Sequence, residues 1–195
     1  MTFSKSPYDG EVFTGLDLKG GALEDLTFYD CRFEGCELGE ASLKRSRFVD
    51  CVFLHCDLSM VNLTDVELSS VQFGHTALVG VNGSLLARTS VAPLELRFDT
   101  CTLNYATFRD LDLSGSTFED CLAHEVAFSG VKLIGTSFWG TDLQGSTFHD
   151  CDLSDADFRG ARNYGVNVKQ NRVRGMKVSF PEALGLLAGL EVVVS

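Results

Sequence analysis

A period of five residues runs through most of this chain. From Phe13 to Phe158, leucine or phenylalanine stands at every fifth residue, apart from a break at residues 79–97. Outside that break Leu or Phe fills 26 of 27 such positions, and Ala123 is the exception. An α-helix repeats its apolar positions every three or four residues and a β-strand every second residue. The period therefore fits neither a helix nor a flat strand.

A unit of five residues is too short to bury its apolar side chain alone. Four such units close one square coil, in which the central Leu or Phe of each unit points inward from one side. Coils stacked about 4.8 Å apart pair as parallel strands, so that each coil is covered by its neighbours. We therefore predict an all-β fold, a quadrilateral parallel β-helix over residues 1–178, about 40 Å long.

The cysteines follow the same period, because each stands two residues before a central position. Residues two apart on an extended segment point the same way, so this is a second inward position. Small or β-branched residues such as Ala41 and Val66 fill it elsewhere. Zinc ligands and disulfides are the alternatives, but the odd count and the lack of a signal peptide favour reduced, buried thiols that act as small hydrophobes. The seven are Cys31, Cys36, Cys51, Cys56, Cys101, Cys121 and Cys151.

The break at residues 79–97 places Gly83, Arg88 and Pro93 at central positions. Glycine and proline are typical of loops. However, Leu78 and Phe98 are separated by four units, which is the length of one coil. Either a loop replaces a coil, or one distorted coil keeps the stack in register. We favour the distorted coil.

Residues 179–195 differ from the rest and are predicted to be a C-terminal cap and dimerisation segment. Ser179, Pro181 and Glu182 predict a helix start with a capping box. The apolar run ALGLLAGL then predicts a short helix, and EVVV a strand. The end of a solenoid exposes its core and needs a cap, and the tail carries more apolar surface than one coil can cover. A cap alone is the alternative to a two-fold interface. The expected dimer contacts are Phe180, Leu184, Leu187, Leu190, Val192 and Val194.

The charge of the chain indicates a basic partner. The formal net charge of −11 at pH 7 argues against direct nucleic-acid binding and favours a basic protein surface. With coils of four units, the acidic residues form columns along the stack, where neighbouring carboxylates repel each other. We predict that these columns bind the partner, with a merely solvated surface as the alternative. One column is Asp30, Asp50, Asp110 and Asp150, and the other is Asp17, Glu37, Asp57 and Asp157.

Nothing in the sequence indicates catalysis. The four histidines, His55, His75, His124 and His149, fall at outward positions, and His55 and His75 are expected to stack on adjacent coils. Dinucleotide, phosphate-loop, metalloprotease and serine-hydrolase motifs are lacking. We expect no enzyme, no cofactor and no metal. The sequence also lacks an apolar run of about 20 residues or a signal-peptide core, which predicts a cytoplasmic protein.

Two segments, CDLSDADFRGA (151–161) and TDLQGSTFHDCDL (141–153), resemble the pentapeptide-repeat family. This resemblance implies a right-handed quadrilateral β-helix. LVGVN (78–82) and residues 163–194 are similar to a topoisomerase-protecting branch, which includes quinolone-resistance and albicidin-resistance proteins. That similarity implies an acidic homodimer that mimics DNA on DNA gyrase or topoisomerase IV and counters a gyrase-poisoning antibiotic, giving resistance or producer self-immunity. A scaffold solenoid with another protein partner and no role at gyrase is the alternative.

Overall fold

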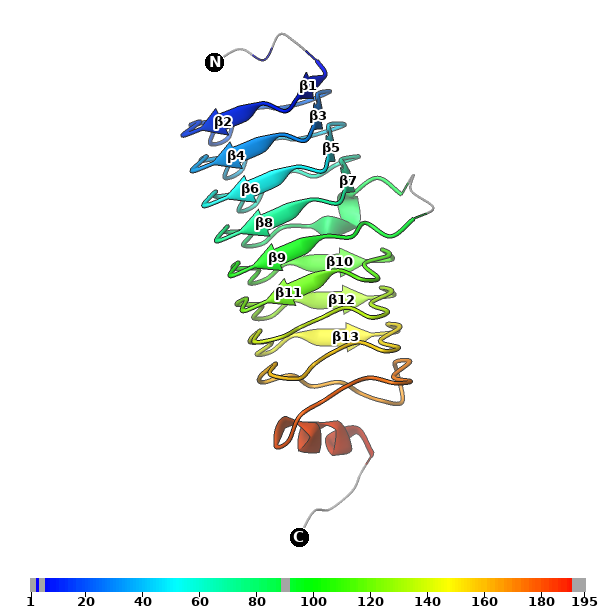
Figure 1. Ribbon diagram of the computed structural model, residues 1–195. Coiled ribbons are helices and arrows are strands. Elements are labelled where there is room, and N and C mark those ends of the chain that lie inside the picture. Colours follow the sequence, from blue (N-terminus) through cyan, green and yellow to red (C-terminus); the bar gives the residue numbers. More distant parts are fainter. Residues whose placement is uncertain (1–2, 4–5, 89–91, 191–195) are drawn as a thin grey trace.

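The protein is a stack of square coils, shown in Figure 1. The computed structural model describes residues 3, 6–88 and 92–190. Strands of two or three residues pair in parallel with strands of the next coil. The predicted fold class is confirmed: the chain is an all-β, right-handed parallel β-helix. Within the described residues, no helix is long and apolar enough to cross a membrane.

Each coil has four faces, which we name A to D in chain order. Face A carries β1 (Tyr8–Asp9), β3 (Thr27–Tyr29), β5 (Arg47–Val49) and β7 (Glu67–Ser69). Face B carries β2 (Val12–Thr14), β4 (Arg32–Glu34), β6 (Val52–Leu54), β8 (Gln72–Gly74), β9 (Arg97–Asp99) and β11 (Thr117–Glu119). Face C is joined by isolated parallel bridges, such as Asp17 to Glu37. Face D carries η1 (Gly83–Leu85), β10 (Thr107–Arg109), β12 (Ala127–Ser129) and β13 (Thr147–His149), and η2 (Glu182–Leu190) follows the last coil.

The corners explain why aspartate and glycine recur two residues after the central position. The residue there has a positive φ, for example 49° at Asp30, 53° at Asp50 and 66° at Gly80. L-residues rarely adopt this left-handed conformation, and glycine and aspartate tolerate it best. Each unit of five residues thus contains a central inward residue and, two positions later, a left-handed corner residue.

Face B supplies an unbroken stack of phenylalanine rings through the core. Neighbouring ring centroids lie 4.6 to 5.4 Å apart along the whole stack. Phe53 lies 4.7 Å from Phe33 and 5.4 Å from Phe73, which confirms the predicted stacking of these three rings. The eight residues are Phe13, Phe33, Phe53, Phe73, Phe98, Phe118, Phe138 and Phe158.

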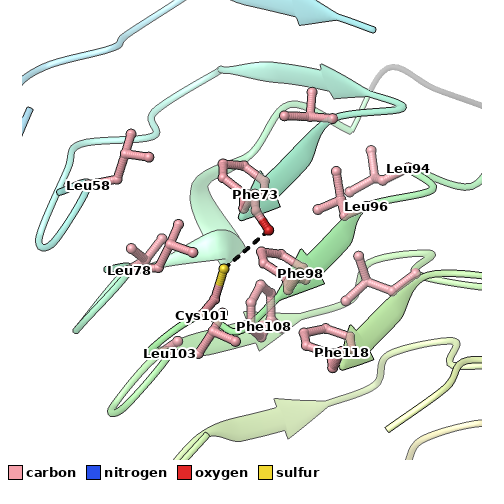
Figure 2. Close-up of a cluster of buried hydrophobic side chains, with 14 of the residues drawn as sticks. Leu58, Phe73, Leu78, Leu94, Leu96, Phe98, Cys101, Leu103, Phe108 and Phe118 are labelled. Carbon is pink, nitrogen blue, oxygen red and sulfur yellow. Dashed lines mark hydrogen bonds between the residues drawn. The ribbon is translucent and has the colours of Figure 1, made fainter. Parts of the chain in front are cut away.

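All seven cysteines are buried and free, as predicted. The prediction that they act as simple hydrophobes was incomplete, because the thiols also donate hydrogen bonds to carbonyl groups. Cys101 Sγ donates to the carbonyl of Phe73 on the previous coil at 3.2 Å, as Figure 2 shows. Thr141 does the same toward Phe118 at 2.8 Å. Inward polar side chains thus satisfy carbonyls in the core wall, which would be costly to leave unpaired.

The burial of the thiols predicts slow chemical labelling. Burial raises the pKa of Cys51 and of Cys56 to about 11. Because thiolates are the reactive form, the native protein at about pH 8 should react slowly with a thiol reagent, and the denatured chain quickly. The raised pKa values stabilise the folded state below about pH 9, and this contribution is lost as the pH rises through about 11. Rapid labelling of most of the seven in the native protein would contradict the inward assignment.

The break between the two runs differs from the predicted coil of four units. Phe73 pairs with Phe98, and Asn82 bridges to Thr107, so this coil contains five units instead of four. The amide of Ala87 still donates a hydrogen bond to the carbonyl of Val66 on the previous coil. The amide of Leu94 donates to the carbonyl of Asp112 on the next coil. Ala87 continues the face A position of Arg47 and Glu67, and Leu94 resumes the pairing on the same face, so the extra unit falls within face A. The pairing resumes in register on both faces B and D, so the core stack continues across the long coil.

Gly83 marks the place on face D where an apolar side chain is missing. Here η1 replaces a strand, and a β-carbon at Gly83 would lie 2.7 Å from Cδ1 of Phe108. The Phe108 ring therefore occupies the space of the absent side chain. An apolar cavity of about 40 Å³ remains beside it, lined among others by Leu63, Leu86 and Leu103.

The C-terminal segment covers the last coil with η2, a 3₁₀-helix that begins at Glu182. The capping box predicted from Ser179 was wrong in its detail, because the Ser179 hydroxyl accepts a hydrogen bond from the Gly160 amide instead. Phe180 is 80% exposed, and Leu184 and Leu190 are also exposed. Leu187 is half-buried. The predicted strand, with Val192 and Val194, lies outside the described residues.

Candidate binding surface

The first predicted acidic column is divided between two corners. Asp30 and Asp50 lie on the corner between faces A and B. Asp110 and Asp150 lie on the corner between faces D and A, because β10 and β13 belong to face D. The extra unit of the long coil causes this quarter-turn difference. The predicted grouping of these four carboxylates was therefore wrong.

The second predicted column is divided in the same way. Asp17, Glu37 and Asp57 do form three consecutive steps on face C, joined by parallel bridges. Asp157 instead bridges to Ser137, which bridges to Thr117, so it lies on face B. Its carboxylate is 2.6 Å from Arg159, and this hydrogen-bonded partner lowers the pKa of Asp157.

The corner that holds Asp30 and Asp50 continues into a carboxylate that was not predicted. The Ser70 amide bonds the carbonyl of Leu94, which places Glu95 next in line. Together, Asp30, Asp50, Ser70 and Glu95 line one groove at this corner. The groove also contains the cationic side chain of Arg97. We call Asp30, Asp50 and Glu95 the corner column.

Unpaired carboxylates gather around faces B and C. Among the described residues, no basic side chain lies within ion-pair distance of the corner column or of the face C column, Asp17, Glu37 and Asp57. The same holds for three further acidic residues, which were also not predicted as part of the surface. These are Asp99, Glu119 and Asp120.

Face A, by contrast, carries alternating charges that pair between coils. Glu67 lies 2.7 Å from Arg47, Asp112 lies 3.1 Å from Lys132, and Asp152 lies 3.4 Å from Arg172. Such exposed pairs contribute little to stability, but they cancel the local field. The uncompensated negative charge of the protein is therefore concentrated on the corner column, face B and face C.

The rings of His55 and His75 stack 4.9 Å apart at the corner between faces B and C, as expected from the sequence. His124 lies 3.4 Å from Asp142, and His149 lies 3.0 Å from Asp150. In the described part of the chain, no three or more His, Cys, Asp or Glu side chains come together as ligands for a metal ion.

Solved structures with the same coil architecture include two kinds of protein. HetL, a pentapeptide-repeat protein involved in heterocyst differentiation regulation from the cyanobacterium Nostoc sp. strain PCC 7120, aligns with a TM-score of 0.64 at 18% identity, over 87% of this chain and 84% of that one. Trypsin-treated QnrB1, a plasmid-mediated fluoroquinolone resistance protein, aligns with a TM-score of 0.56 at 20% identity, over 96% and 99%. At these identities the likeness establishes the fold. No curated protein matches the sequence significantly.

Two family models match the sequence itself. The model described as a pentapeptide repeat region matches residues 26–92, and the model of eight pentapeptide repeats matches residues 124–162. Together the two matches cover more than half of the chain, on both sides of the long coil. The repeats, the coil geometry and these matches agree, and the chain belongs to the pentapeptide-repeat proteins.

Proposed function

We propose that this protein binds DNA gyrase as a DNA mimic and protects it from a gyrase-poisoning antibiotic, with topoisomerase IV as a second target. The proposal depends on one observation above all: among the described residues, the carboxylates of the corner column and of the face C column, Asp17, Glu37 and Asp57, lack cationic partners and repeat along the stack. Duplex DNA presents a negative charge about every 1.7 Å along its axis. A basic surface that holds DNA is thus a suitable partner for a rigid acidic rod.

The resemblance of the sequence to topoisomerase-protecting proteins also supports this proposal. Residues 163–194 are similar to the tail of topoisomerase-protecting proteins, and QnrB1, which shares the fold, is a fluoroquinolone resistance protein. No feature of the described residues favours an enzyme. The protein would act by occupying the surface of gyrase where DNA lies, rather than by modifying a drug.

A supercoiling assay tests this proposal. Gyrase, relaxed plasmid and a gyrase poison are combined with increasing amounts of the protein. We expect less drug-stabilised cleaved DNA at low protein concentration, and inhibition of supercoiling at high concentration, as for a competitor of DNA. Both effects should weaken as salt rises, because exposed charges are screened. If neither effect occurs at low salt, gyrase is not the partner, and the scaffold alternative with another protein partner stands.

We further propose that the protein is a homodimer joined through residues 180–195. The exposed side chains of Phe180, Leu184 and Leu190 at the end of the stack support this, since a solenoid end is otherwise open to further pairing. Truncation after Ser179 should give a monomer or an aggregate, measured by light scattering. A full-length protein that is monomeric at micromolar concentration would refute the dimer.

A further inference from the structure

Face C carries an uncharged patch in the middle of its acidic surface. Two columns of outward positions run along this face. The first, joined by parallel bridges, is Asp17, Glu37, Asp57, Ala77, Thr102, Leu122 and Asp142. The second is the corner after face C, which reads Glu40, Met60, Gly80, Tyr105 and Glu125. Each column loses its charges over three coils and regains them further along, and the two uncharged stretches overlap on two coils.

Large apolar side chains occupy this uncharged stretch. Met60 is 61% exposed, Tyr105 65% and Leu122 45%. Met60 lies over Gly80, so closely that a side chain at Gly80 would collide with its Sδ. Val79, between the two columns, adds a half-buried apolar side chain. We call Met60, Val79, Tyr105 and Leu122 the face C patch.

The patch spans three steps of the stack, or about 14 Å at the strand spacing. Single exposed apolar residues need no explanation, but a group of them in one place marks an interaction surface. Other exposed apolar residues, such as Val12 and Ile134, stand on faces B and A away from this group. The size suits one short segment of a partner rather than a broad, flat interface.

The charges around the patch decide what kind of partner fits. Glu40 and Asp57 border it on one side, and Glu125 and Asp142 on the other. A second copy of this patch would bring like-charged rims together, and duplex DNA or an anionic membrane would also be repelled. We infer that the face C patch binds a segment of another protein in which apolar side chains are flanked by lysine or arginine. This inference does not require the partner to be gyrase.

Two labelled synthetic peptides of equal length and equal positive charge test the inference. One alternates blocks of lysine and leucine, and the other replaces every leucine with serine. The lysine–serine peptide measures electrostatic attraction alone, whereas the lysine–leucine peptide also reports apolar contact. By fluorescence anisotropy at about 0.15 M salt, where the screening length is about 8 Å, the parent protein should bind the leucine peptide at least about tenfold more tightly.

Variants of the protein test whether the face C patch is responsible for the preference for the leucine peptide. The triple variant Met60→Ser, Tyr105→Ser, Leu122→Ser should lose the preference for leucine and keep its affinity for the serine peptide. The matched control Val12→Ser, Ile134→Ser removes exposed apolar side chains elsewhere and should keep the preference. These side chains are outward, so circular dichroism should show unchanged folding. If the triple variant unfolds, the single variant Tyr105→Ser replaces it and should lose part of the preference.

Three outcomes would overturn the inference. The first is equal binding of both peptides by the parent protein. The second is a control variant that loses the preference as completely as the triple variant does. The third is a triple variant that dissociates a dimer in light scattering, because the patch would then be a contact between copies of this chain.

Discussion

Replacing Phe53 with alanine should lower the free energy of unfolding by about 3–5 kcal/mol. Phe53 is 2% exposed and stacks between Phe33 and Phe73 in the middle of the ring stack. The change removes a buried ring and leaves a cavity that neighbouring rings cannot fill, because each is fixed to its own strand. Urea unfolding followed by circular dichroism measures the loss.

Lys44→Ala is the matched control, because Lys44 points outward on face D and is not part of the core. A surface change of this kind should alter stability by no more than about 0.5 kcal/mol. Equal and small effects of the two substitutions would contradict a core filled by the phenylalanine stack. Because coils contact only their neighbours, the Phe53→Ala transition is also expected to broaden as part of the stack opens first.

Neutralising the corner column should raise the protein concentration needed to protect gyrase by at least about tenfold. The variant Asp30→Asn, Asp50→Asn, Glu95→Gln removes three carboxylates from one corner without changing side-chain size. Asparagine tolerates the left-handed backbone at positions 30 and 50, so the fold should be kept. The remaining protection should also depend less steeply on salt, because fewer exposed charges contribute.

A control variant separates the column from net charge. Glu67→Gln, Asp112→Asn, Asp152→Asn also removes three negative charges, but from carboxylates that pair with Arg47, Lys132 and Arg172 on face A. It should protect gyrase almost as well as the parent. If both variants lose protection equally, total charge rather than the column is responsible. If the folded corner variant protects as well as the parent, the proposed contact is wrong.

The period of five predicted the fold, the inward residues and the burial of the cysteines, because each depends only on position within one unit. The faces were harder to predict. Adding one unit leaves the period unchanged, yet it moves every later residue by a quarter turn. The distance from Leu78 to Phe98 therefore fitted one coil in the sequence, while in the structure Phe98 lies against Phe73. Leu94, an apolar residue one position after the central phase and buried in the structure, was the signal of the longer coil.

The same ambiguity about the length of this coil limited the prediction of which acidic residues lie together on the surface. Asp30 with Asp50, and Asp17 with Glu37 and Asp57, precede the long coil and were grouped correctly. Glu95 was missed because it lies within the break. The thiol hydrogen bonds were missed because a cysteine is usually interpreted as apolar. Five of the cysteines bond the carbonyl of a phenylalanine 23 residues earlier, as Cys36 bonds Phe13, and that spacing was the available signal.

The register of the stack has a consequence for how the chain is made. Each strand pairs with the strand four units later, as Phe13 with Phe33 and Phe28 with Phe48, and only the long coil needs a fifth unit. The aromatic rings of Phe3, Tyr8 and Phe13 pack together at the beginning of the rod. The first coils therefore hold all their partners once a short length of chain has left the ribosome. Each new coil is then added to a finished template, so synthesis and folding proceed in the same direction.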